Sequence, residues 1–193
     1  MRVGEVVESA TFSFGAECYE LHLPPPLGGL VKTADGEVDI YGVVCHAATT
    51  SLDPARSAIA LGRGEEAEED LYRSHPQLAQ LLRTTFQAVV AGHRREGRVY
   101  HYLPPRPPRL HSFVHSCTDA EVQEFSRSAD FLALDLASPV PGAREEVVAA
   151  CLRYLSQFQP DPQAFLVAAG KELTLLLRGQ GPALSSILRR VRL

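Results

Sequence analysis

The chain has 193 residues, of which 45% are hydrophobic and 22% are charged, and its formal net charge is −4. This composition is typical of a folded globular protein and excludes global disorder. A net negative charge provides no overall attraction to nucleic acid, so any such contact would have to be local. The apolar run at residues 164–169 is far shorter than the roughly 20 residues of a membrane span, and residues 1–15 hold no apolar block of a signal peptide. We therefore expect a cytoplasmic protein that does not contact membranes.

The first fifty residues carry the patterns of β structure. Runs rich in β-branched and aromatic residues predict strands at residues 2–9, 12–23, 30–33 and 38–47. The stretch Pro24–Gly29 cannot continue a hydrogen-bonded ladder and is expected to be a loop. Asp35-Gly36 is typical of a tight hairpin turn. Short strands separated by loops in this way favour a small barrel or sandwich.

A helix is expected after this β segment. Acidic residues crowd into positions 65–70 and indicate a solvated helix face or a helix start. Ser74 can cap a helix that has Pro76 in its first turn. Apolar residues then recur at spacings of three and four, and Gly92 would end the helix. These apolar residues are Leu78, Leu81, Leu82, Val89 and Val90. The pattern predicts a helical insertion at about residues 64–96.

Strands are expected again at residues 98–103 and 110–117, joined by the extended, proline-rich segment Pro104–Arg109. Thr118 and Glu121 have the spacing of a capping box, which predicts a short helix. The run at residues 131–134 is too short for its period to distinguish strand from helix. Beyond residue 140 the spacing is helical throughout, with helix starts at Asp161-Pro162 and at Pro182.

No local motif indicates catalysis. Gly170-Lys171 lacks the first glycine and the Ser or Thr of a phosphate-binding P-loop. The four cysteines form no C-x-x-C pair, which favours reduced, packed thiols. Histidines and a cysteine on one strand face are the best metal-binding candidates, because alternate residues of a strand share a side. They are His111, His115 and Cys117, with His101. Phe113 shares that face, and histidines that only make hydrogen bonds are the favoured alternative, so we expect no cofactor, no bound metal and no catalytic residue.

Basic residues are unevenly distributed along the chain. Three local groups form the candidate interaction surface: His93, Arg94 and Arg95; Arg106 and Arg109; and Arg189, Arg190 and Arg192. Such groups can contact phosphate. Helix-dipole complementarity at the C-terminus and pairing with the acidic segment 65–70 are the favoured explanations.

Four short motifs follow one another near the N-terminus: Gly4–Ser9, Phe12–Phe14, Leu27–Val31 and Ile40–Val44. In order and spacing they resemble the HerA–ATP synthase barrel, or HAS barrel, family. The stretch Pro105–Pro108, leading towards a helix at residues 121–125, is similar to the exit of that barrel. The resemblance implies a small closed β-barrel that supports ring assembly and partner docking on a HerA-like or other ring ATPase, without performing chemistry. No nucleotide-binding domain follows the barrel, so the chain looks like the stand-alone bacterial members, and an accessory role is implied.

The sequence thus predicts an α+β protein with a small N-terminal, Greek-key-like β-barrel and a C-terminal helical subdomain. The barrel is expected within residues 1–117, interrupted by the helical insertion at about 64–96, and the helical subdomain within residues 118–193. We expect a non-enzymatic interaction module that docks on an ATPase or a nucleic-acid-processing complex. The alternatives are a nucleic-acid-binding barrel that uses the basic groups, and a metal-dependent enzyme. The amphipathic segment at residues 184–191 favours a homo-oligomer.

Overall fold

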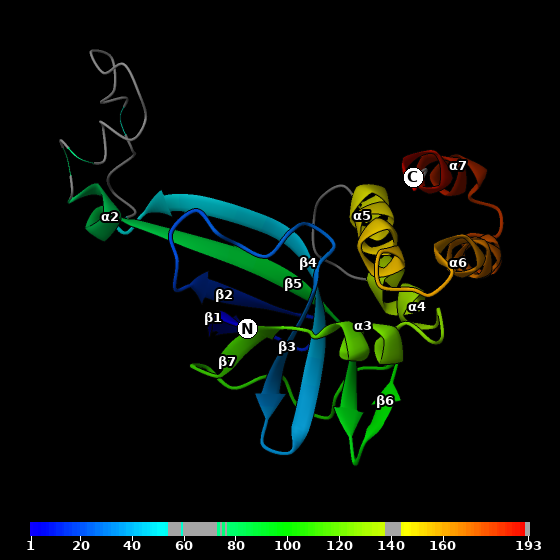
Figure 1. Ribbon diagram of the computed structural model, residues 1–193, viewed down its shortest axis with the longest axis horizontal. Helices are drawn as coiled ribbons and strands as arrows, with labels where there is room; N and C mark the ends of the chain where they lie inside the picture. The colour runs from blue at the N-terminus through cyan, green and yellow to red at the C-terminus, as the bar shows by residue number, and fades with distance from the viewer. Residues whose placement is uncertain (54–58, 60–72, 74, 76, 138–143, 192–193) are drawn as a thin grey trace.

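A computed structural model describes the chain except for residues 54–58, 60–72, 74, 76, 138–143 and 192–193. Antiparallel strands occupy the N-terminal part, and the helices of the C-terminal part lie together at one side of them (Figure 1). The strands are β1 (Arg2–Ser9), β2 (Ser13–Cys18), β3 (Leu30–Asp35), β4 (Val38–Ser51), β5 (Leu82–Arg95), β6 (Arg98–Tyr100) and β7 (Phe113–Ser116). The predicted α+β class is confirmed.

The strands close into a barrel. Their order is β2-β1-β7-β3-β4-β5, and a further pairing between β2 and β5 completes the ring. β6 lies outside the ring, paired with the end of β5. Closure satisfies the backbone groups that an open sheet would leave at its edges. The expected small barrel is therefore confirmed, including the loop at Pro24–Gly29 and the turn that joins β3 to β4.

The barrel interior is filled by side chains. Its apolar core consists of Val6, Phe14, Ala16, Val31, Ile40, Val44, Phe86, Ala88, Val90 and Val114. Gly42 lies where the Phe14 ring crosses β4, because a Cβ atom there would lie 2.7 Å from Phe14 Cε1. A side chain at this position would push against the core, so the glycine allows the close approach.

The predicted helical insertion at about residues 64–96 is wrong from Leu82 onwards. Only α2 (Leu78–Leu81) is helical, and β5 begins at the next residue and pairs with β4 from Leu82↔Ser51 to Arg94↔Asp39. Residues 88–93 are all buried, so the apolar residues of β5 do not alternate as they do in a strand with one wet face. The apolar residues of β5 therefore recur at spacings that are also typical of a helix. The β-branched residues at this place favour a strand; they are Thr84, Thr85, Val89 and Val90. The acidic positions 65–70, Ser74 and Pro76 lie outside the described residues.

Helices follow the barrel as the sequence predicts. They are α3 (Asp119–Phe125), α4 (Phe131–Ala137), α5 (Arg144–Ser156), α6 (Pro162–Leu176) and α7 (Gly181–Arg190). Thr118 and Glu121 form the predicted capping box of α3, and Asp161 caps α6 by accepting from the Ala164 amide at 2.9 Å. The ambiguous run at residues 131–134 is helical. None of the described helices is both long and apolar enough to cross a membrane.

The barrel and the helices share one hydrophobic cluster. From the barrel it contains Leu30, Tyr41, Val43 and Ala91, and from the helices it contains residues such as Phe125, Phe131, Leu132, Leu152, Leu155 and Leu173. The loop before β3 touches α5 directly, since a Cβ atom on Gly28 would lie 2.3 Å from the Ala150 carbonyl carbon. The helices are therefore part of the packing of the barrel.

Candidate interaction surface

In the first predicted basic group, His93 and Arg94 make contacts within the chain, whereas Arg95 is exposed. His93 is only 3% exposed, and its Nδ1 donates to the Tyr102 carbonyl oxygen at 3.0 Å. Arg94 Nη2 donates to Asp39 Oδ2 at 2.6 Å, and Glu121 and Glu124 lie within 3.8 Å of the same guanidinium group. Hydrogen bonding to Asp39 raises the pKa of Arg94. His93 is thus no surface residue, and Arg94 faces carboxylates of its own chain.

The second basic group anchors the proline-rich segment. Arg106 Nε lies 3.1 Å from Asp35 Oδ2, and Arg109 Nε lies 2.7 Å from Asp35 Oδ1. Asp35 is 7% exposed, whereas the side chains of both arginines are mostly exposed, so they contact one buried carboxylate at the β3–β4 turn from the surface. Directly before Arg109, the Ser9 hydroxyl donates to the Pro108 carbonyl oxygen. These bonds hold Pro104–Arg109 on the barrel as a connector between β6 and β7.

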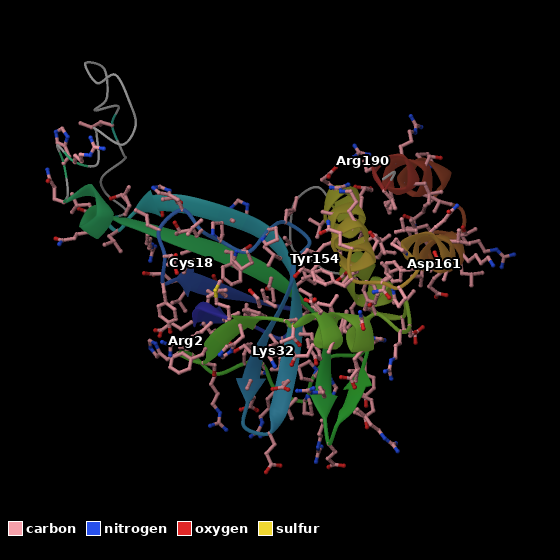
Figure 2. All side chains as sticks on the ribbon, viewed as in Figure 1. Arg2, Cys18, Lys32, Tyr154, Asp161 and Arg190 are labelled. Carbon is pink, nitrogen blue, oxygen red and sulfur yellow. The ribbon has the colours of Figure 1, made fainter. Side chains whose placement is uncertain are left out.

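The third basic group lies on α7, far from the other two. Arg190 Nε lies 2.8 Å from Glu146 Oε2 on α5, and Arg153 contacts the other oxygen of that carboxylate at 3.0 Å. Arg189 is exposed, and Arg192 lies outside the described residues. Figure 2 shows Arg190 beside α5 and α7, well away from Arg2 and Lys32 on the barrel. The α7 group is therefore separate from the barrel, whereas Arg95 of the first group and Arg106 of the second line one groove together with the acidic residues Asp35 and Glu37.

An arginine held between two aromatic rings stands on the outer face of the barrel. The Arg2 guanidinium carbon lies 4.6 Å from the centre of the Phe113 ring and 5.1 Å from the centre of the Tyr19 ring. Both distances are within the range of cation–π attraction. Phe113 is 49% exposed and Tyr19 is 48% exposed. Half of each ring therefore remains available to a partner.

Glu5 holds Tyr19 and His111 in place beside the Arg2 stack. The Tyr19 hydroxyl donates to Glu5 Oε2 at 3.1 Å, and His111 Nδ1 lies 3.0 Å from Glu5 Oε1. The hydrogen bonds from His111 and Tyr19 lower the pKa of Glu5. We refer to Arg2, Glu5, Tyr19, His111 and Phe113 as the Arg2 face. Its members come from β1, β7 and the residues that flank β2 and β7, so the barrel assembles it from distant parts of the chain.

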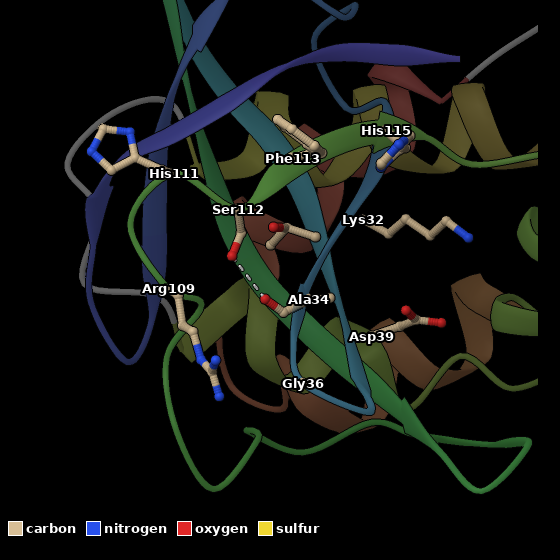
Figure 3. Close-up of a pocket in the computed structure, with 10 residues that line it drawn as sticks. Lys32, Ala34, Gly36, Asp39, Arg109, His111, Ser112, Phe113 and His115 are labelled. Carbon is tan, nitrogen blue, oxygen red and sulfur yellow. Dashed lines mark hydrogen bonds between the residues drawn. The ribbon is translucent and has the colours of Figure 1, made fainter.

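A groove of about 470 Å³ adjoins the Arg2 face and shares His111 and Phe113 with it. Figure 3 shows its other lining residues, among them Lys32, Asp39 and His115, around the outer side of β3 and β7. Lys32 forms an ion pair with Glu121 at the start of α3. Burial and then the charge of Lys32 lower the pKa of His115. The groove thus extends the Arg2 face towards α3.

The candidate metal ligands do not form one site, although His111 and His115 line the same groove. His111 bonds to Glu5, whereas His101 Nε2 donates to the Phe125 carbonyl oxygen at 2.9 Å. Burial and the nearby Glu121 raise the pKa of Cys117 to about 12, which disfavours the thiolate that a metal requires. Within the described part of the chain, no three His, Cys, Asp or Glu side chains are grouped so that they could hold a metal ion. The favoured alternative, histidines that make hydrogen bonds, describes His101 and His111.

Sequence reasoning missed Arg2 and Tyr19 because nothing near them in the chain marks them. In the sequence, Phe113 stands out only because it is expected to share a strand face with His111 and His115. The Arg2 face depends on the pairing of β1 with both β2 and β7, which places Glu5 opposite both Glu17 and Phe113. These residues could have been found only from the alternation of inward and outward side chains along β1 and β7, combined with a correct prediction of the strand order.

The sequence matches no protein-family model, and no curated protein is similar to it. The function is therefore inferred from the geometry of the surface.

Proposed function

We propose that the protein is a non-enzymatic interaction module and that the Arg2 face is its docking surface for a partner protein. The observation that carries this proposal is the exposed stack of Tyr19, Arg2 and Phe113. Arginine and aromatic residues are enriched at protein interfaces and dominate their binding energy. On the barrel they stand together, half exposed, next to a groove that can receive a partner side chain.

Preorganisation supports the same proposal. The guanidinium group is held by two rings, and Tyr19 and His111 are held by Glu5. Side chains that are already fixed lose less conformational freedom when a partner binds. A surface of this kind therefore gains more net affinity from its contacts than one built from mobile side chains.

The partner class comes from the resemblance to the HAS barrel. The closed barrel agrees with the small closed barrel that the resemblance implies, and the Greek-key-like arrangement and membership of that family are part of the proposal. On this basis the partner is a ring ATPase of the HerA type or another ATPase of a nucleic-acid-processing complex. Burial raises the pKa of Cys18 and Cys45 to about 11, so neither thiol supplies a nucleophile at pH 7. A role without chemistry is consistent with these values.

Direct binding of nucleic acid is less well supported. Arg94, Arg106, Arg109 and Arg190 all contact carboxylates of the same chain. A phosphate would have to compete with these partners, and each arginine that stays paired contributes little to a salt-dependent affinity. A pull-down with nuclease treatment distinguishes nucleic-acid binding from docking on a protein.

The test is a pull-down of the tagged protein from its host lysate after nuclease treatment, followed by binding of the purified partner. Phe113→Ala and Arg2→Glu alter the Arg2 face, and Arg189→Glu makes the same charge change on α7. We expect the two face variants to weaken the dissociation constant about tenfold or more, as for residues that dominate an interface, and Arg189→Glu to leave it within about twofold. Equal binding by all variants would refute the docking surface, and recovery that disappears with nuclease would favour nucleic-acid binding instead.

A further inference from the structure

The carboxyl group of Asp135 is buried and lacks a partner among the residues that the structure describes. The residue is 3% exposed, and neither of its oxygens has a hydrogen-bond partner in the described part of the chain. A buried carboxylate normally requires a cation or several donors, because its charge is poorly tolerated in an apolar interior. The carboxyl groups of Asp35 and Glu121 follow this rule through their ion pairs, and Asp135 does not.

Asp135 lies at the joint between the barrel and the helices. It belongs to α4, which packs against β5, α5 and α6. Phe131 and Leu132 of the same helix are fully buried in the shared cluster, together with Tyr41 and Ala91 of the barrel. A charge on α4 therefore acts on the packing that connects the two parts.

Within the described residues, burial is the one cause that shifts the pKa of Asp135. It raises the pKa to about 7, and no charged side chain of β5, α5 or α6 in the described structure contributes to the shift. The groups that respond to its charge are the thiols of Cys45 on β4 and Cys151 on α5. Both have a raised pKa and are neutral at pH 7. His101 also lies near α4, with its ring 5.9 Å from that of Phe131. Burial lowers the pKa of His101, whereas the charge of Asp130, just before α4, acts to raise it by a smaller amount.

We propose that Asp135 is a pH-sensitive switch that seats α4 firmly when its carboxyl group is protonated and loosens it when the group is ionised. The expected sign follows from linkage. The pKa of Asp135 is higher in the folded protein than in the unfolded chain, so its contribution to stability is complete below about pH 4, falls as the pH rises, and levels off above about pH 7. Opening α4 would expose apolar residues of the barrel that the shared cluster now covers.

His101 acts in the opposite direction. Burial lowers its pKa, so its protonation destabilises the packing as the pH falls. A comparison between variants at each pH separates the two effects, because replacing Asp135 leaves His101 unchanged.

The experiment measures amide hydrogen exchange of α4 between pH 5 and pH 8, corrected for the intrinsic dependence of exchange on pH. In the wild-type protein, we expect the α4 opening equilibrium to rise by up to about tenfold per pH unit between pH 5 and pH 6.5. Asp135→Asn should remove this dependence, and Asp135→Leu should remove it without leaving a buried amide. Asp130→Asn, a matched change at an exposed position just before α4, should keep the dependence that Asp135 causes and alter only the contribution of His101, whose pKa the charge of Asp130 acts to raise.

Alkylation of Cys151, read by mass spectrometry of its peptide, provides a second measurement. Cys151 is fully buried on α5, so its modification reports opening next to Asp135. At pH 7.5, the wild-type protein should react faster than Asp135→Asn. The proposal is overturned if α4 exchange in the wild type does not change with pH after correction, or if both Asp135 variants retain the wild-type dependence.

Discussion

Arg94 and Asp39 face each other across the β4–β5 pair, and Arg94 Nη2 donates to Asp39 Oδ2 at 2.6 Å. The same guanidinium group approaches Glu121 and Glu124 of α3. An arginine that looks like part of a basic patch in the sequence therefore connects two strands and a helix. Its role in the barrel is structural.

We expect Arg94→Met to lower the free energy of unfolding by about 1 kcal/mol, the upper part of the range for partly exposed ion pairs. Arg95→Met is the control, because Arg95 is exposed and contacts only the adjacent Glu96 at 3.5 Å among the ion pairs of the described residues. Urea unfolding at pH 7 measures both. Equal effects would show that the contacts of Arg94 do not contribute to stability.

Glu121 should make stability depend on pH. Burial acts to raise its pKa, but hydrogen bonds from Lys32 and Thr118 outweigh burial and hold the pKa below its usual value. The stabilisation is therefore present above about pH 4.5, the value of the unfolded chain, and is lost as the pH falls through the lower value of the folded protein. Glu121→Gln keeps a capping side chain and should cost about 1 kcal/mol at pH 7. The difference from wild type should vanish in acid, whereas a difference that persists at pH 3 would assign the effect to the helix cap.

Alanine substitutions at Gly28 and Gly97 distinguish the cost of backbone strain from the cost of steric crowding. Their φ angles are 77° and 74°, but a Cβ atom on Gly28 would collide with the Ala150 backbone, whereas a Cβ atom on Gly97 would have no neighbour within 4 Å. We expect Gly97→Ala to cost about 1 kcal/mol through the left-handed conformation. Gly28→Ala should cost about 3 kcal/mol or more, because overpacking is added to the strain. Chemical denaturation measures the two costs, and similar values would contradict a tight contact between the loop and α5.

Thr33 and Thr84 are both buried in strands, but their hydroxyl groups differ in hydrogen bonding. Among the described residues the Thr33 hydroxyl has no hydrogen-bond partner, whereas Thr84 Oγ1 accepts from the His22 amide and bonds to Thr49, each at 2.8 Å. Replacing a hydroxyl without a partner by a methyl group removes a desolvated polar atom at little cost. Thr33→Val should therefore raise the thermal midpoint or leave it unchanged. Thr84→Val should destabilise the protein by about 1–3 kcal/mol, and the opposite order would mean that Thr33 has an unrecognised partner such as bound water.

The elements that could be predicted from the sequence are those that local residues define. The β3–β4 turn follows from Asp35-Gly36, the start of α3 from Thr118 and Glu121, and the start of α6 from Asp161. β5 could not be predicted in the same way. Its burial depends on the neighbours β2 and β4, and residues 88–93 are covered on both faces. The period that identifies a half-exposed strand is absent there.

The candidate surface was even less accessible from the sequence. Arg106 and Arg109 stand close together in the sequence, but they turn towards Asp35. Arg2 and Phe113 are far apart in the chain and meet only because β1 pairs with β7. The sequence shows where charged residues lie along the chain. Which carboxylate pairs with a basic residue, or which aromatic ring packs on it, depends on the order in which the strands pair.

The shared hydrophobic cluster has a consequence for how the chain can be divided. A fragment that ends at residue 117 would leave Leu30, Tyr41, Val43 and Ala91 facing water, although each is at most 1% exposed in the whole chain. Large exposed apolar patches promote aggregation. The barrel is therefore not expected to fold by itself when it is expressed alone or fused to another protein. Such a fragment would have to include the helices that cover the barrel.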